Sequence, residues 1–286
     1  DLGLISVLLD AGAGPSWRYV DEEGNTFVRS EGLAMASFDM FKNGLFSSDT
    51  AAPYRVNSHG IKRLSFDDFK HALQHSKTNP LAAIEERFDM LQRLADALDK
   101  SPAIFGEEIA RPGNLVDYVL EQAKNNSVKA TVIFDAIIDG LYTIWPTESP
   151  KVKGDLWPYS PIYVQGQGGS DLVCLHKIPQ WLTYSLIEPL EEYGLKVTDL
   201  DDLTALAEYR NGGLLVDSGV LTLKHPENAQ MEFDVGSQLI VEWRALTLIL
   251  MEHVATEVRK QLGLTAEQFP IAKVLQGGTW FAGRAI

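Results

Sequence analysis

Acidic, aromatic and basic side chains interrupt a Leu- and Val-rich run in the segment DDLTALAEYRNGGLLVDSGVL, residues 201–221. Glu208 and Asp217 supply two carboxylates, and Tyr209 and Arg210 follow the first of them. Carboxylates in apolar surroundings are typical of sites for acid–base chemistry, but also of a buried ion pair with an arginine. The composition of the segment leaves both readings open.

The start of this segment has helical spacing. Leu203, Leu206 and Ala207 fall on one helical face, and Gly212 and Gly213 come soon afterwards. We therefore expect a helix that ends at the glycines. Glycine after a helix usually terminates it, and it also lets a ligand approach the backbone closely.

A second acid–base pair occurs in IVEWRALTLIL, where Glu242 and Arg244 stand two residues apart. On a helix this spacing puts them on different faces. Glu242 falls on an apolar stripe with Leu239, Leu246 and Ile249. A carboxylate on such a stripe needs a partner, so it belongs either to a structural pair or to the wall of a pocket.

Two further segments carry candidate binding residues. In LLDAGAGPSW, Asp10 ends a predicted helix and small residues lead to Trp17, which indicates either a ligand loop or a plain turn with Trp17 in the core. In HKIPQWLTYSL, an amide and several flat or charged groups lie within two helical turns, an arrangement suited to a flat polar ligand or to a core with a surface lysine. These are Lys177, Gln180, Trp181 and Tyr184.

The C-terminal segment VLQGGTWFAGR combines a glycine pair with a predicted helix start. We expect Gly277 and Gly278 to form a turn and Thr279 to cap a helix that carries Trp280 and Arg284. A turn before a helix N-terminus can hold an anion, although such turns are common.

Composition narrows the class of protein. The 286 residues are 45% hydrophobic and 22% charged, as in a soluble globular protein. A net charge of −14 disfavours nucleic-acid partners, and we find no apolar run of about 18 residues, so no membrane partner is expected. The single cysteine, Cys174, excludes an internal disulfide and fits a cytoplasmic location.

The elements that must position these residues are mostly helices. The clearest amphipathic pattern lies at residues 79–100, and another long one runs from Ser237 to Gly263. Convincing strand patterns are few, so the predicted fold class is mainly α, a multi-helix globular fold. Residues 146–171 are rich in Pro and Gly and predict a long loop. The chain is either one compact unit over 1–286 or two helical lobes, 1–145 and 172–286, joined by this loop.

Several long phrases resemble the uracil catabolism protein 4 family of fungi and bacteria. They are SVLLDAGAGPSW, RSEGLAMASFDMFKNGLFSSD, HKIPQWLTYSLIEPLE, LTALAEYRNGGLLVDSGVL, QLIVEWRALT and VLQGGTWFAGR. The resemblance implies a role in a pyrimidine breakdown route in which uracil is made a ribonucleotide, its ring is opened and urea is released. It also implies that this chain lacks family segments at both ends.

A fainter similarity links the segments around residues 180, 208 and 243 to the queuosine salvage protein family, which are N-glycosidases. That resemblance implies an all-helical scaffold similar to helix-hairpin-helix DNA glycosylases. Glu208 stands where that family has Asp, and Gly212-Gly213 replace Pro-Gln. The residues that match directly are Tyr209, Arg210, Glu242 and Arg244.

Together the resemblances imply an N-ribosyl hydrolase that needs neither metal nor redox cofactor. Carboxylates would stabilise the oxocarbenium-like state and activate water, from Glu208, Asp217 or Asp10. A donor at the leaving group would come from Gln180 or Tyr184, and ring stacking from Trp17, Trp181 or Trp280. A 5′-phosphate would be held by Lys177, Arg210, Arg244 or Arg284.

The substrate implied is a small nucleoside or nucleotide derivative, such as ribosylurea or its 5′-phosphate. Two alternatives stay open: hydrolysis of another C–N bond, amide or ureido, in the same route, and a non-catalytic binding protein for the pathway. We also expect that the chain can form a homo-oligomer.

Overall fold

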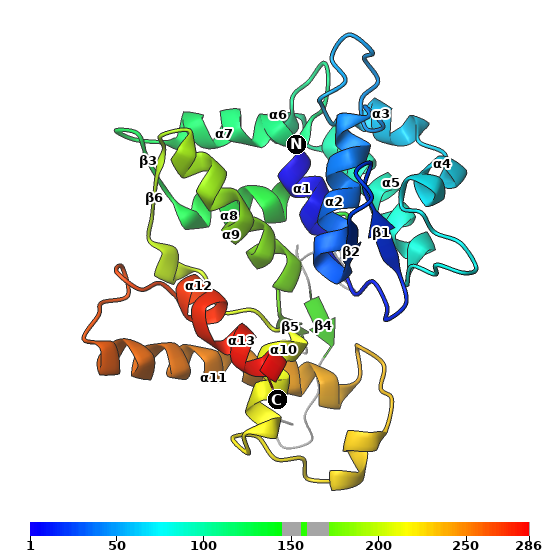
Figure 1. Cartoon of the computed structure of the whole chain (residues 1–286). Helices are drawn as coiled ribbons and strands as arrows, with labels where there is room; N and C mark the ends of the chain where they lie inside the picture. Colours follow the sequence, from blue (N-terminus) through cyan, green and yellow to red (C-terminus); the bar gives the residue numbers. More distant parts are fainter. Residues whose placement is uncertain (145–155, 159–171, 286) are drawn as a thin grey trace. The chain divides into compact units, whose positions relative to one another are not determined.

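The computed structural model describes residues 1–144, 156–158 and 172–285. It confirms the mainly helical fold class, and its strands form short pairs (Figure 1). The chain divides into two compact units. Unit 1 contains Asp1–Val128, Asp135–Ile144 and Ser185–Lys196, and unit 2 contains the described residues of Lys129–Phe134, Trp145–Tyr184 and Val197–Ile286. The division runs through two helices.

Unit 1 is built from α-helices, one 3-10 turn and a β-hairpin. The helices are α1 (Leu2–Leu9), α2 (Arg29–Lys42), α3 (Ser58–Arg63), α4 (Phe66–Ala72), α5 (Ile84–Lys100), α6 (Pro102–Phe105) and α7 (Leu115–Gln122), with the 3-10 turn at Pro112–Asn114. The hairpin pairs β1 (Arg18–Val20) with β2 (Thr26–Val28), so the short polar insert after the first helix turns back on itself. Two helices, α8 (Ala130–Gly140) and α9 (Lys177–Glu192), contribute residues to both units.

The core of unit 1 forms where apolar helix faces meet. The amphipathic pattern at residues 79–100 yields α5, whose Leu91, Leu94 and Leu98 are fully buried. Helix α5 packs against α1, α3 and α4, as Figure 1 shows. Helix α1 is apolar almost throughout, contacts α2 and α5, and buries Leu4, Ile5, Leu8 and Leu9 on one broad face.

Unit 2 contains helices of very different length. They are α10 (Tyr209–Asp217), α11 (Gln238–Leu262), α12 (Ile271–Val274) and α13 (Trp280–Ala285), with 3-10 turns at Leu200–Asp202 and Pro226–Gln230 and a π-helical segment at Leu275–Thr279. Three short strand pairs occur in the described chain as a whole: β1–β2, β3 (Ser127–Lys129) with β6 (Lys196–Thr198), and β4 (Leu156–Pro158) with β5 (Leu172–Cys174).

The core of unit 2 is a compact apolar cluster. It contains Leu206, Leu215, Met251, Ile271 and Leu275, and aromatic rings from α9 and α13 pack against it. Helix α11 starts after Ser237 and ends at Gly263, which has the left-handed φ of 67° that glycine tolerates. Both ends of this helix are where the sequence predicts them.

Two glycine pairs do not break the chain as expected. Gly212 and Gly213 lie inside α10, because the helix begins at Tyr209 and not near Leu203. Gly277 and Gly278 lie within the π-helical segment, which continues directly into α13. The predicted turn before α13 is therefore wrong, Thr279 is no N-cap, and this stretch offers no free helix N-terminus to an anion.

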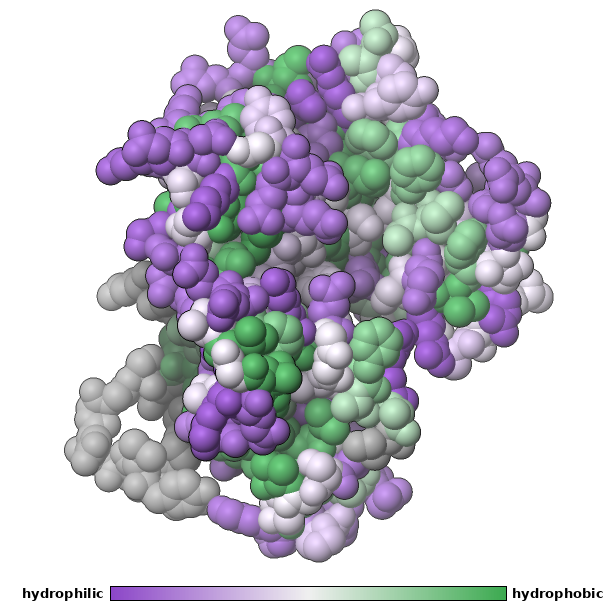
Figure 2. All heavy atoms as spheres, turned by 60° about the vertical axis from the view of Figure 1, so that its left-hand side comes forward, coloured by the Kyte–Doolittle hydropathy of each residue, from purple (hydrophilic) through white to green (hydrophobic). Residues whose placement is uncertain are grey.

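The predicted loop at residues 146–171 lies largely outside the described residues. Its residues 156–158 form β4, which pairs antiparallel with β5, so the segment is not all loop. Within the part of the chain that the structure describes, no helix is both long and apolar enough to cross a membrane. Figure 2 shows hydrophilic side chains over much of one face, with hydrophobic patches between them.

Candidate functional site

Helix α10 begins with a side-chain cap supplied by Glu208. Its Oε2 accepts a hydrogen bond from the backbone N–H of Arg210 at 2.7 Å, and its Oε1 accepts one from Asn211 at 2.8 Å. Free N–H groups at a helix start favour a negative charge. The carboxylate is thereby held in one orientation, half-buried at the start of the helix.

Helix α11 packs closely on α10 through Trp243. The indole N–H of Trp243 donates to the carbonyl oxygen of Gly212 at 3.1 Å. A Cβ on Gly212 would lie 2.8 Å from the indole ring, which is closer than real Cβ contacts. Only glycine fits at this position without displacing the ring, so this glycine has a packing role and not the role of a helix terminator.

A cavity of about 250 Å³ opens in unit 2 beside the Glu208 cap. Residues from α9, from the start of α10 and from α11 line it: Lys177, Ala207, Glu208, Tyr209, Ile240, Trp243, Arg244 and Thr247. The sequence had pointed to Lys177, Glu208, Tyr209 and Arg244. The fold brings these four together from segments far apart in the chain.

The cavity combines one carboxylate with two cationic side chains and an apolar wall. Arg244 donates from Nε to the carbonyl oxygen of Ala207 at 3.3 Å, which fixes the guanidinium at the cavity edge. Tyr209 is 70% exposed, so its ring stands at the entrance. This lining suits a small ligand that has a negatively charged end for the two cations and a polar part that becomes positively charged near the carboxylate.

Asp217 lies at the other end of α10 and is exposed. With a rise of about 1.5 Å per residue, nine residues separate it from Glu208 by about 13 Å along the helix. Paired carboxylates of glycosidases stand about 5–10 Å apart. The structure therefore does not bring these two acids together on one bond, and of the two only Glu208 lines the cavity.

The aromatic residues proposed for stacking on a ligand are mostly part of the core. Trp181 and Trp280 pack on each other with ring centroids 5.0 Å apart. Both rings, and that of Tyr184, lie against the apolar cluster of unit 2. Burial, and secondarily the charge of Glu252, raises the pKa of Tyr184, whose hydroxyl donates to the carbonyl oxygen of Thr204 at 2.8 Å.

The remaining unit 2 candidates do not line the cavity. Gln180 is buried on α9, and Glu242 is half-buried on α11. Arg210 lies with its guanidinium carbon 5.7 Å from the centre of the Tyr209 ring, next to the entrance. Arg284 is exposed on α13.

Asp10 and Trp17 belong to unit 1. Trp17 is 1% exposed, and its indole N–H donates to the carbonyl oxygen of Leu73 at 2.9 Å, so its ring is a core element. Asp10 is the C-cap residue of α1, close enough to the buried Arg87 for its charge to favour the charged guanidinium. The plain-turn reading of this segment describes Trp17 better than a ligand loop does.

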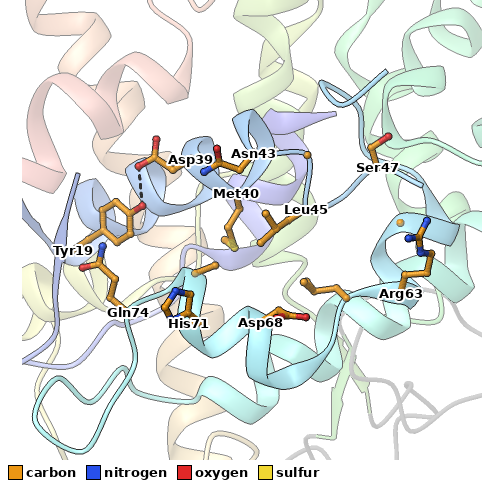
Figure 3. Close-up of a pocket in the computed structure, with 14 residues that line it drawn as sticks. Tyr19, Asp39, Met40, Asn43, Leu45, Ser47, Arg63, Asp68, His71 and Gln74 are labelled. Carbon is orange, nitrogen blue, oxygen red and sulfur yellow. Dashed lines mark hydrogen bonds between the residues drawn. The ribbon is translucent and has the colours of Figure 1, made fainter. Parts of the chain in front are cut away.

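Unit 1 contains a larger cavity of about 670 Å³ that sequence reasoning did not predict. Figure 3 shows Tyr19 and Gln74 at one end of it, Arg63 at the other, and Met40 between them. Several of its polar groups are committed to the fold. The Tyr19 hydroxyl donates to Asp39 at 2.8 Å, and both amide atoms of Gln74 bond the backbone of Val20.

Size alone would favour the unit 1 cavity as the site. We favour the unit 2 cavity because a fixed carboxylate and two cations converge there, whereas the unit 1 lining uses its tyrosine and glutamine to hold β1 in place. The sequence signal for the unit 1 cavity is weak: Asp68 and His71 share a face of α4, a spacing that many surface helices have.

Sequence reasoning missed Ala207 as a lining residue of the unit 2 cavity, and it missed three residues of α11: Ile240, Trp243 and Thr247. With Arg244 they follow the i, i+3, i+4, i+7 spacing of one helical face. The predicted apolar stripe through Leu239, Leu246 and Ile249 is a different face, and it is half-buried or exposed. The buried positions of α11 are Val241, Thr247, Met251 and Ala255.

Comparisons with known proteins identify the family of the chain. The family described as "Protein of unknown function (DUF1688)" matches residues 1–286. A protein named "Uracil catabolism protein 4" from Lachancea kluyveri is 39% identical over 318 aligned positions, which cover 100% of this chain and 71% of the relative. "Protein urg3" from Schizosaccharomyces pombe is 35% identical over 293 positions, which cover 100% of this chain and 69% of that protein. The chain therefore belongs to the DUF1688 family, together with these two proteins.

Proposed function

We propose that this protein acts in uracil catabolism and hydrolyses the N-glycosidic bond of a ring-opened uridine derivative, such as ribosylurea or its 5′-phosphate. The name of the Lachancea kluyveri relative supports the pathway. The observation that carries the reaction is the unit 2 cavity, where the fixed carboxylate of Glu208 faces the same space as Lys177 and Arg244. The mainly helical fold agrees with the scaffold that the similarity to queuosine salvage proteins implies.

The carboxylate of Glu208 can serve the reaction in two ways. Its negative charge stabilises the oxocarbenium-like state that forms as the C1′–N bond breaks. Each of its oxygens keeps a lone pair beyond the one used by the backbone N–H, so one of them can also accept the proton of the attacking water. The hydroxide adds to C1′, and the electron pair of the broken C1′–N bond goes to the ureido nitrogen. This nitrogen takes up a proton from solvent water as urea leaves, and Glu208 returns its own proton to solvent.

Two cationic side chains of the cavity could bind the phosphate of a phosphorylated substrate. Lys177 and Arg244 reach the cavity from α9 and α11, and a phosphate between them would form charge-assisted hydrogen bonds. This would place the ribose between the phosphate site and Glu208. Among the residues that the structure describes, no second carboxylate lines the cavity, so Glu208 is the acid on which the proposal depends.

The proposal is tested by incubating the protein with ribosylurea and with its 5′-phosphate while urea and reducing sugar are measured together. We expect equal release of both products. Release of ammonia or of a new carboxylate, without free sugar, would identify hydrolysis of another C–N bond. Binding by calorimetry without any product would show a binding protein and overturn the proposal.

A further inference from the structure

Buried polar atoms without hydrogen-bond partners are concentrated in unit 2. In the part of the chain that the structure describes, six residues have such atoms, and four of them come from α9, the start of α10 and the π-helix–α13 junction. These four are Gln180 (Oε1), Asn211 (Oδ1 and Nδ2), Thr279 (Oγ1) and Trp280 (Nε1). Native proteins leave few such atoms, so a local group of them needs a physical reason.

The three elements that carry these atoms pack against one another. The Trp181 and Trp280 rings connect α9 with α13. A Cβ on Gly283 would lie 2.5 Å from the carbonyl oxygen of Arg210, so α13 approaches the start of α10 very closely. Thr279 precedes Gly283 by one helical turn and lies on the same side. The atoms without partners thus belong to one packed region.

Two of these residues are direct neighbours of the cavity lining. Gln180 follows Lys177 by three residues on α9, and Asn211 follows Glu208 by three residues at the start of α10. Positions three apart share a helical face. Asn211 is also tied to Glu208 directly, because its backbone N–H donates to the Glu208 carboxylate at 2.8 Å. Both amides therefore belong to helical turns that also supply lining residues, although neither of them lines the cavity itself.

Asn211 has the largest number of unpaired buried atoms among these residues. It is 0% exposed, and neither its amide oxygen nor its amide nitrogen has a partner among the residues that the structure describes. An unsatisfied buried amide costs stability that a leucine of the same branching would not cost. Such a residue is explained if a ligand supplies both a hydrogen-bond acceptor and a donor.

We propose that Asn211 and Gln180 recognise a planar group with N–H donors next to a carbonyl, an amide or ureido end of the ligand. The Asn211 Nδ2 would donate to the ligand carbonyl, its Oδ1 would accept from the adjacent N–H, and the Gln180 Oε1 would accept from a further N–H. The inference rests on the proposed function, because it names the part of the substrate that is read at the same cavity. Admitting this group requires a small opening of the packed helices.

The test separates a recognition role from a structural one. The variants are Asn211→Leu and Gln180→Met, which keep side-chain shape but remove the amides. The control is Thr183→Val, since Thr183 is equally buried on α9 but its hydroxyl donates to the carbonyl oxygen of Pro179 at 2.8 Å. Binding of ethylurea, and of tetramethylurea as a probe without N–H donors, is measured by ligand-observed NMR, and thermal unfolding is measured without ligand.

We expect ethylurea, but not tetramethylurea, to bind the unchanged protein, and each amide variant to weaken that binding at least tenfold. Asn211→Leu should raise the unfolding midpoint by a few degrees, whereas Thr183→Val should lower it and leave binding intact. Unchanged ethylurea binding in both amide variants would overturn the inference, and so would loss of the native fold in both.

The outcome is independent of turnover. If ribosylurea is not hydrolysed but ethylurea binding depends on Asn211, the proposed reaction fails and the recognition site stands. If ribosylurea is hydrolysed with unchanged KM in both amide variants, the reaction stands and the recognition site fails.

Discussion

The carboxylate of Glu208 accepts a hydrogen bond from the backbone N–H of Asn211 at 2.8 Å, in the first turn of α10. The same side chain lines the unit 2 cavity. One residue therefore caps a helix and, within the described part of the chain, supplies the only carboxylate that lines the cavity. Changes at Glu208 should affect both stability and activity, and a control is needed to separate the two effects.

Glu208→Gln should abolish most turnover while leaving the protein folded. The amide cannot accept a proton from water or oppose a developing cation, so we expect the turnover number to fall at least about 100-fold. Loss of one cap hydrogen bond should cost about 1 kcal/mol of unfolding free energy. The matched change is Asp217→Asn at the exposed end of α10, which should leave turnover within about twofold because Asp217 does not line the cavity. Full activity in Glu208→Gln would contradict the assignment.

Lys177→Met should discriminate between the two candidate substrates. If the lysine binds a 5′-phosphate, KM for ribosylurea 5′-phosphate should rise about tenfold or more, while KM for ribosylurea stays the same. Arg284→Met removes an exposed cation that is outside the cavity and should change neither value. Equal effects of Lys177→Met on both substrates would show that the lysine does not bind phosphate.

The two neighbouring glycines of α10 should respond to alanine with opposite signs. Gly212→Ala places a Cβ 2.8 Å from the Trp243 ring and should destabilise the protein by about 1–3 kcal/mol. Gly213 has open space at its Cβ position, so Gly213→Ala should stabilise it by about 0.5–1 kcal/mol through helix propensity. Urea unfolding monitored by circular dichroism measures both. Destabilisation by Gly213→Ala would show that the space beside it is needed.

Arg87 should be essential for the stability of unit 1. Its guanidinium is buried and donates to the backbone carbonyl oxygens of Leu9, Gly12 and Ala82, which ties the end of α1 to the start of α5. Burial lowers the pKa of Arg87, and the charge of Asp10 partly opposes this. Arg87→Met should cost about 3 kcal/mol or more, because it removes three hydrogen bonds made by a buried side chain.

The control for this change is Arg93→Met on the exposed side of the same helix, which should shift the unfolding free energy by no more than about 0.5 kcal/mol. Thermal unfolding followed by tryptophan fluorescence suits the comparison, since Trp17 lies in the unit 1 core. Similar midpoints for the two variants would contradict the role of Arg87.

Glu252 should make the stability of the protein depend on pH. Burial raises the pKa of Glu252, although the Ala205 N–H that it accepts at 3.0 Å acts in the opposite direction. Because the folded pKa lies above the unfolded one, the folded state binds the proton more tightly. The stability that protonated Glu252 contributes is therefore fully present below the unfolded pKa, and it is lost as the pH rises through the folded pKa.

In the Glu252→Gln variant the side chain is neutral at every pH, so the loss of stability with rising pH should disappear. The variant should be more stable than the unchanged protein at pH 7, and the difference should shrink towards pH 4. Thermal midpoints across this range measure it, with Glu257→Gln on an exposed part of α11 as the control. A difference that grows as the pH falls would show that the pKa shift has the opposite sign.

The helical class and the long helices could be predicted from sequence. The repeat of leucines in α5 and the Ser237 and Gly263 boundaries of α11 depend on interactions within a few residues, which sequence spacing records directly. Four residues of the cavity could also be predicted from sequence. Lys177, Glu208, Tyr209 and Arg244 lie in segments unusually rich in functional groups.

Tertiary packing decided the rest. Gly212 lies within a helix and not at its end because Trp243, from a distant part of the chain, packs against its backbone. Asp217 falls outside the cavity because it is the last residue of α10, whose first turn lines the cavity. Spacing along a chain reports which residues share a helix face, but which faces meet depends on contacts between distant segments. The sequence by itself therefore determined the helices and the chemical types available, and the tertiary structure selected Glu208, Lys177 and Arg244 to share one cavity.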